Sequence, residues 1–375
     1  MPNGNLGNGL GTQASPFELW DVLDLDALRG KPNSIDNRIF IRFKADIDFR
    51  NSPFADLFTT IRFGNNLVST SAWDFVDIDG EGHSLRNFRQ IGASVDCCGL
   101  FRYVDGNIRN LNIHCKSHYA FGSVQTGILA QFARSALIEN INIIGSALIE
   151  ANTVSGLIGS LQQINNTTPT IVTNCTVNLR VATSNTTSVS FFGFCQFMTT
   201  GAGHTVVFHK CVSANNIYCG TSGVNAGGFV GALSSNGNVT FDSCISECDF
   251  VSLTPVGQFT GIVAGYRAAT GAMSTQNYIN CISKCSFDGM PPATVNNLAA
   301  FGPNTSWVTV TRSYAACKYD LRTSTANIRG GDGIFLFDWE NSGLPLSRFT
   351  DGTVNGLTTA QLKSKEFMQS RGWMF

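Results

Sequence analysis

Two kinds of short apolar segment alternate along the chain. The first is marked by Asn or Cys, as in VTNCTVNL at 172–179 and FDSCISECDF at 241–250. The second is bounded by glycine, as in GLIG at 156–159, GGFVGAL at 227–233 and GIVAG at 261–265. Both kinds are short and lack helical periodicity, and polar or glycine-rich turns separate them, which predicts β-strands.

The marked segments recur at a nearly constant distance. Successive cysteines are 36, 33 and 37 residues apart in one series and 37 and 32 in a second. The two series are Cys175, Cys211, Cys244, Cys281 and Cys248, Cys285, Cys317. A period of 32–37 residues with two or three strands per unit fits one coil of a β-solenoid. The sequence therefore predicts an all-β, right-handed, single-stranded parallel β-helix.

Stacked coils would arrange equivalent side chains in columns, because each strand pairs with its equivalents about 4.8 Å away. We expect each cysteine series to form an inward-facing column, the first flanked by Ile141 and Ser313. Reduced thiols that fill the core are favoured over disulfides or a metal, because side chains on neighbouring parallel strands suit a disulfide poorly. Cys97, Cys98 and Cys219 lie off both columns and are the candidates for a bond between chains.

An asparagine recurs just before the first column, at Asn140, Asn174 and Asn280. Asn tolerates a left-handed backbone, and stacked amides hydrogen-bond along the axis. We therefore expect a bend of the coil at these residues. A polar binding stripe is the alternative, but the bend already explains the residue type.

Both ends of the predicted solenoid resemble caps. The segment at 15–30 reads as a helix with Ser15 as N-cap and Pro16 at its first position, and a second short helix is expected from Thr358. Such caps would cover the open edges of the first and last coils. The predicted organisation is an N-terminal arm and capping helix at 1–35, about eight coils at 36–340, and a C-terminal capping segment at 341–375.

Composition excludes several classes of function. The net charge is −1 and only 14% of residues are charged, against about 25% in an average soluble domain. There is no basic run for nucleic acid, and no apolar stretch approaches the roughly 20 residues of a membrane helix. The chain starts with Met and a polar segment that lacks the features of a secretory signal, which favours folding in the cytoplasm.

Several segments are similar to one known group of proteins. The stretches at 7–28, 39–49, 75–88 (FVDIDGEGHSLRNF) and 98–113 (CGLFRYVDGNIRNLNI) resemble bacterial surface β-solenoids of the GLUG-repeat adhesin type. The tail at 356–375 resembles the closing segment of the same proteins. The likeness covers the first 115 and the last 20 residues, whereas the middle matches only as a generic coil pattern.

This resemblance implies a pectate-lyase-like superhelix used for display or adhesion, an architecture shared by phage tailspikes, fibres and capsid decoration proteins. Caps and coils without a visible anchor favour a virion component, either a capsid decoration (head fibre) or part of a tail fibre or spike, folded in the host cytoplasm. Expected partners are capsid or tail proteins, a host-surface glycan, and further copies of the chain, with a trimer as one arrangement. The alternatives are a carbohydrate-active tailspike and a bacterial cell-surface adhesin.

Candidate chemistry is sparse, and no enzyme activity or cofactor is predicted. The densest acidic cluster is Asp77, Asp79 and Glu81, whose alternate positions in a strand would share one face. A solvated turn is favoured over an acid–base or metal site there. The trio His114, Cys115 and His118 has spacing that suits zinc but lacks the second half of a complete ligand set.

Overall fold

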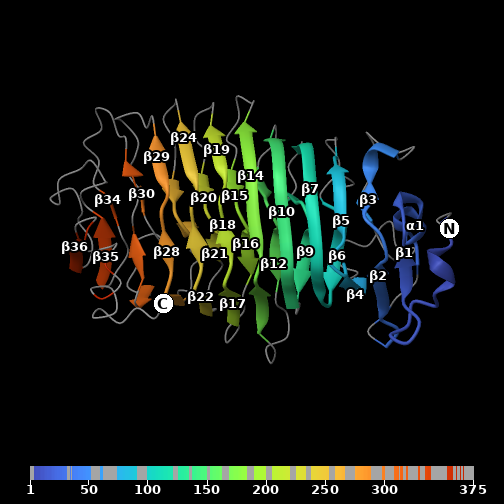
Figure 1. The fold of residues 1–375 in the computed structure, drawn as a ribbon. Helices are drawn as coiled ribbons and strands as arrows, with labels where there is room; N and C mark the ends of the chain where they lie inside the picture. Colours follow the sequence, from blue (N-terminus) through green and yellow to red (C-terminus); the bar gives the residue numbers. More distant parts are fainter. Residues whose placement is uncertain are drawn as a thin grey trace.

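The computed structural model describes residues 4–31, 34, 36–51, 60–61, 74–90, 99–120, 126–134, 137–149, 153–162, 169–183, 190–199, 205–219, 225–233, 238–252, 258–266 and 275–288. It also describes 298–299, 308–311, 313–315, 318–319, 328–329, 334–338, 353–357, 360, 364 and 366. Within these residues the fold is a parallel β-solenoid, as predicted. Figure 1 shows successive coils side by side, beginning at the N-terminal end where α1 lies.

One unbroken row of parallel pairs links the coils. It passes through Phe17, Ile41, Ile78, Ile108, Ile138, Val172, Phe208, Phe241, Tyr278 and Val310. The coils around Ile108 repeat every 30 residues, as the contact from Asn140 to Asn110 shows. This repeat is shorter than the period of 32–37 residues read from the cysteines. The cysteine series begins only at Cys175, so it carries no information on these earlier coils.

Among the described residues, the strands of the coils fall into four groups. The first group is β1(Phe17–Leu19), β2(Ile39–Phe43), β4(Asp74–Asp79), β13(Thr170–Thr173), β17(Thr205–His209), β22(Asn238–Asp242), β27(Thr275–Ile279) and β31(Val308–Thr311). The second, beyond a bend, is β3(Ile47–Asp48), β5(Ser84–Phe88), β14(Thr176–Thr183), β18(Val212–Ser213), β19(Asn216–Cys219), β23(Ile245–Ser246), β24(Asp249–Ser252), β28(Ile282–Ser283), β29(Ser286–Asp288), β32(Tyr314–Ala315) and β33(Lys318–Tyr319). Strands β7(Ile108–Ala120) and β10(Leu137–Ile149) run through both groups.

The other two groups close the coil. The third is β8(Thr126–Gly127), β11(Thr153–Ser155), β15(Ser190–Phe192), β20(Asn225–Gly227), β25(Gln258–Thr260), β30(Leu298–Ala299) and β34(Ile328–Arg329). The fourth is β6(Phe101–Asp105), β9(Ala130–Arg134), β12(Ile158–Gln162), β16(Cys195–Thr199), β21(Val230–Leu233) and β26(Val263–Tyr266). Towards the C-terminus, β35(Ile334–Asp338) pairs with β36(Thr353–Leu357).

The bend before the first cysteine column is left-handed, as expected. Asn140, Asn174 and Asn280 have φ values of 54°, 52° and 52°. Lys210 and Ser243 adopt the same conformation at the equivalent point of their coils, with φ values of 50° and 57°. Lysine and serine rarely adopt a left-handed conformation by themselves. The stacking of the coils therefore imposes the bend at Lys210 and Ser243.

The structure places Cys175, Cys211, Cys244 and Cys281 in one column, fully buried. The N–H groups of Ile245 and Ile282 donate to the carbonyl oxygens of Cys211 and Cys244, both at 2.9 Å, which fixes the register. Each thiol donates to a carbonyl of the preceding coil, with S···O distances of 3.2–3.6 Å. Burial raises the pKa of the Cys175 and Cys244 thiols, which keeps them protonated as donors.

The second column holds Cys248 and Cys285, both buried, with the buried amide of Asn215 one coil earlier. Beside it runs a column of buried serines, Ser213, Ser246 and Ser283. The Ser246 Oγ lies 3.2 Å from the Cys285 Sγ and donates to the carbonyl of Gly261 at 2.5 Å. The cysteine pattern alone had suggested a purely apolar core. Around the thiols the core also holds these buried hydroxyl and amide groups.

Other predicted cysteine positions fall outside this part of the structure. Cys317, Cys97 and Cys98 lie outside the described residues, and the side chain of Cys219 in β19 does too. The eight cysteines that are described are free and buried; besides the six above they are Cys115 and Cys195.

The glycine-bounded segments were predicted as single strands, which is wrong in detail. β20 ends at Gly227, the chain turns a corner at Gly228 and Phe229, and β21 begins at Val230. Phe229 points into the core, while a Cβ on Gly228 would collide with the carbonyl oxygen of Gly261 in the next coil. Glycine is required there because the backbones of successive corners approach closely.

Aromatic side chains also stack along the axis. The Phe208 and Phe241 rings are 5.1 Å apart at their centroids, and the Phe241 and Tyr278 rings 5.2 Å apart. All three are buried, and the spacing follows that of the strands. They fill the interior between the bend and the corner formed by Phe194 and Phe229, whose rings stack at 4.6 Å.

The N-terminal cap differs from the prediction in where its helix begins. Phe17–Leu19 form β1 and pair with β2, so the helix α1(Val22–Ala27) starts later. Its N-cap is Asp21, not Ser15, and the Asp21 Oδ1 accepts the N–H groups of Leu23 and Asp24 at 2.9 and 3.0 Å. The predicted helix from Thr358 lies almost entirely outside the described residues.

Replacing Cys244 tests the thiol column. An apolar column would make Cys244→Ser cost about 1–3 kcal/mol. Because the Cys244 thiol already donates to the carbonyls of Phe208 and Asp242, we expect Cys244→Ser to cost less than about 1 kcal/mol. Cys244→Leu should cost about 1–3 kcal/mol by overpacking. Urea unfolding of both variants measures this, and a serine variant less stable than the leucine variant would contradict the geometry.

Candidate functional site

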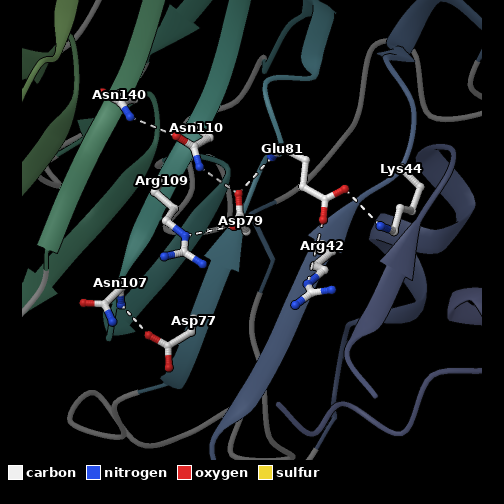
Figure 2. A network of polar contacts seen from close by, with 9 residues as sticks. All are labelled: Arg42, Lys44, Asp77, Asp79, Glu81, Asn107, Arg109, Asn110 and Asn140. Atoms are coloured by element: carbon white, nitrogen blue, oxygen red, sulfur yellow. Dashed lines mark hydrogen bonds and ion pairs between the residues drawn. The ribbon is translucent and has the colours of Figure 1, made fainter. Parts of the chain in front are cut away.

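The predicted acidic cluster lies on the outer surface of the N-terminal coils. Asp77 and Asp79 share one face of β4, as the alternation predicted, whereas Glu81 lies in the turn that follows, with φ of 48°. Figure 2 shows these side chains between two cations, one in β2 and one just after it, and polar residues in β7, just before it and in β10. The residues drawn are Arg42, Lys44, Asp77, Asp79, Glu81, Asn107, Arg109, Asn110 and Asn140.

Asp79 is the centre of this network. Its Oδ1 accepts the Glu81 N–H and the Asn110 Nδ2, both at 3.0 Å, and its Oδ2 accepts the Arg109 Nε at 2.8 Å. The Asn140 Nδ2 donates to the Asn110 Oδ1 at 2.9 Å and extends the chain of contacts to a third coil. Partial burial raises the pKa of Asp79, but the hydrogen bonds and the Arg109 charge outweigh it and hold the pKa below its ordinary value.

Asp77 and Glu81 are bound in the same manner. The Asp77 Oδ1 accepts the Asn107 N–H at 2.8 Å, and its Oδ2 lies 3.5 Å from the Arg38 Nε. The Glu81 Oε2 accepts the Lys44 Nζ at 2.9 Å. The expected turn is present at Glu81, which is exposed. Each carboxylate also joins its coil to a neighbouring one, because the register brings residues 30 or more positions away alongside it.

The same use of carboxylates recurs along the rod. Paired groups on successive coils include Asp46 with Arg86, Asp48 with Asn87, Asp105 with Arg134, His209 with Asp242, Glu247 with Lys284, and Asp249 with Ser286. A hydrogen bond from the Ser84 N–H, opposed by burial and helped by Arg86, holds the pKa of Asp46 below its ordinary value. These carboxylates thus bond one coil to the next.

A groove of about 460 Å³ lies beside the acidic cluster. Its lining includes the guanidinium groups of Arg38, Arg42 and Arg109 and the carboxylates of Asp77 and Asp79. The Arg38 Nη1 donates to the Asp105 carbonyl at 2.6 Å, and the Arg42 Nε lies 3.8 Å from a Glu81 carboxylate oxygen. Every charged group of this groove therefore has an opposite charge or a carbonyl as its partner within the protein.

The trio His114, Cys115 and His118, whose spacing alone suited zinc, is not arranged as a ligand set where the structure describes it. His114 and Cys115 are neighbours in β7 and point to opposite faces, with Cys115 buried in the core. The side chain of His118 lies outside the described residues. Among the residues that the structure describes, no group of three or more His, Cys, Asp or Glu is arranged to hold a metal ion.

A second hollow, of about 620 Å³, lies over β14, β19 and β24 and was not predicted from the sequence. Arg180, Asn216, Tyr218 and Asp249 line it. Tyr218 is 44% exposed, whereas most large apolar side chains in the described part of the chain are buried. The sequence did hold one sign of this hollow: in the strand NIYC at 216–219, the tyrosine occupies a position that alternation directs outward.

Among the helices in the described part of the chain, none is long and apolar enough to span a membrane.

The fold is similar to a solved structure along nearly the whole chain. The crystal structure of a "putative immunoglobulin A1 protease" from Bacteroides ovatus superposes with a TM-score of 0.51 at 16% sequence identity, over 96% of this chain and 89% of that chain. At such identity the likeness shows a shared β-solenoid fold and nothing of the activity. No protein-family profile and no curated protein matches the chain in sequence. The resemblance to GLUG-repeat adhesins stays a prediction.

Asp79→Ala should destabilise the N-terminal coils by about 1–3 kcal/mol, because it leaves Arg109 and Asn110 without their acceptor. Glu81→Ala is the matched control. It removes a surface ion pair with Lys44 and should cost less than about 1 kcal/mol. Urea unfolding compares the two, and equal costs would contradict the central place of Asp79.

The lowered pKa of Asp79 also predicts a pH dependence. Its ionised form favours the folded state, so its contribution is present above the ordinary pKa of 3.8 and is lost as the pH falls below it. Asp79→Asn should therefore show a shallower loss of stability below about pH 4 than the unchanged chain. Urea midpoints between about pH 6 and pH 3 measure this. Identical slopes would show that Asp79 is not held ionised by the fold.

Proposed function

We propose that the chain is a non-enzymatic, structural or adhesive β-helix on the surface of a virion, as a capsid decoration (head fibre) or as part of a tail fibre or spike. It would fold in the host cytoplasm and assemble with capsid or tail proteins. The observation that carries the non-enzymatic part is the engagement of the acidic side chains between coils.

A glycosidase needs a pair of free carboxylates, one with a raised pKa to act as the acid. In the N-terminal network the opposite is found: the pKa values of Asp46 and Asp79 are lowered, chiefly by hydrogen bonds from Ser84 and Asn110 of the adjacent coils and further by Arg86 and Arg109. Carboxylates held in this way strengthen the rod. They also favour the structural reading over a carbohydrate-active tailspike.

The interior supports the proposed role as a stiff display scaffold. Thiols, serines and aromatic rings repeat along the axis in fixed columns, and each coil is bonded to the next. A solenoid of this kind exposes long continuous outer faces, which are suited to contacts with other proteins or with extended ligands. The GLUG-like segments at the ends support adhesion or display as well. The name of the Bacteroides protein describes that protein, and no described residue of this chain favours proteolysis specifically.

Two measurements test the proposal. Immunogold labelling of purified virions, with an antibody raised against the chain, should decorate the capsid or tail. Label confined to the cell envelope would instead support a bacterial surface adhesin and overturn the virion role.

The second measurement addresses chemistry. The purified chain, incubated with host capsule or lipopolysaccharide, should release no reducing or unsaturated sugar ends. Release that is abolished by Asp79→Asn or Asp77→Asn, with the fold intact by circular dichroism, would overturn the non-enzymatic reading.

A further inference from the structure

The hollow over the middle coils is crossed by two rows of outward side chains that run along the axis. The pairing of β14 with β19 and of β19 with β24 fixes both rows. The polar row is Arg180, Asn216 and Asp249, and the apolar row is Ala182, Tyr218 and Val251. The surface there is therefore amphipathic, with a hydrogen-bonding strip beside a non-polar strip.

Tyr218 dominates the apolar row. Its neighbours Ala182 and Val251 are small, so the phenol is the largest non-polar surface in the hollow, and it is 44% exposed. Among the described rings of these coils, those of Phe208, Phe241 and Phe250 are buried in the core. A tyrosine offers a flat apolar face and a polar tip, which suits a ligand that is itself both apolar and polar.

The polar row differs from the groove beside Asp79 in how its groups are satisfied. Within the described part of the chain, the side chains of Arg180 and Asn216 make no hydrogen bond or ion pair. Asp249 accepts the Ser286 Oγ at 2.7 Å and retains a second carboxylate oxygen. The hollow thus presents an uncompensated guanidinium, an amide and a carboxylate oxygen in one line.

These rows match the chemistry and the repeat of a sugar chain. Successive rungs lie about 4.8 Å apart, close to the length of one hexopyranose unit. The C–H face of a sugar ring can stack on the Tyr218 phenol, while Asn216 and Asp249 exchange hydrogen bonds with its hydroxyls. A guanidinium without an acidic partner is suited to a carboxylate of the ligand.

We propose that the hollow over β14, β19 and β24 binds a segment of a glycan chain that carries carboxylated sugars. Tyr218 stacks on a ring and Arg180 binds a carboxylate. The proposal rests on the proposed adhesive function, since it names the class of surface ligand that such a rod would hold. The hollow is distinct from the groove beside Asp79, whose charges are already paired.

Binding of the full chain to immobilised glycans tests this. The acidic probes are polysialic acid, hyaluronan and polygalacturonate, and the matched neutral probes are carboxyl-reduced hyaluronan and dextran. We expect binding to at least one acidic probe and none to the neutral ones. Tyr218→Ala should weaken the binding by about tenfold or more, Tyr218→Phe should retain it, and Arg180→Gln should abolish the preference for the carboxylated chain.

Trp20→Ala is the control variant, because Trp20 is similarly exposed, at 41%, and lies in the N-terminal cap. It should bind as the unchanged chain does, and circular dichroism verifies that each variant is folded. The site is overturned if no acidic probe binds, if neutral and acidic probes bind equally, or if Tyr218→Ala binds unchanged. Release of sugar ends during binding would overturn the non-enzymatic function but leave the site standing.

Discussion

Parallel pairing of each strand with its equivalent one coil away is the interaction on which the rest of this structure depends. It sets a repeat of about 4.8 Å along the axis, and every column follows from it: the thiols from Cys175 to Cys281, the rings from Phe208 to Tyr278, and the serines from Ser213 to Ser283. It also holds the bend in a left-handed conformation, even at Lys210. Stability is therefore distributed over many nearest-neighbour contacts, as in other repeat proteins.

The same pairing determines which surface groups remain available. Near the N-terminus, carboxylates and guanidinium groups of adjacent coils meet in register and neutralise one another, as Asp79 and Arg109 do. Over the middle coils the outward row of Arg180 and Asn216 has no such complement among the described residues. One part of the outer surface thus serves cohesion, while another is free to contact a ligand. This division is what connects the architecture to the proposed role as a surface scaffold.

The sequence predicted the fold and much of the register, because cysteines and asparagines mark equivalent points of the coils from residue 140 onward. The 30-residue coils around Ile108 carry the asparagine mark at Asn110, level with Asn140, but they hold no cysteine of the first column, and their shorter repeat was not foreseen. The partners of Asp79 could not be predicted either, since Arg109 and Asn110 become its neighbours only through the register. The helix was predicted to begin too early because Ser15 and Pro16 have the pattern of a helix start. Pairing with β2 makes Phe17–Leu19 a strand instead.

Cross-linking across adjacent coils tests the register most directly. Glu247 and Lys284 form an exposed ion pair at 3.1 Å although they are 37 residues apart in sequence. In the double variant Glu247→Cys, Lys284→Cys, a short reagent with two thiol-reactive ends, which fluoresces only when attached at both, should react efficiently. The double variant Arg180→Cys, Lys284→Cys, whose positions lie several coils apart, should react poorly. Equal reaction of both pairs, or none in the first, would contradict the stacking of the coils.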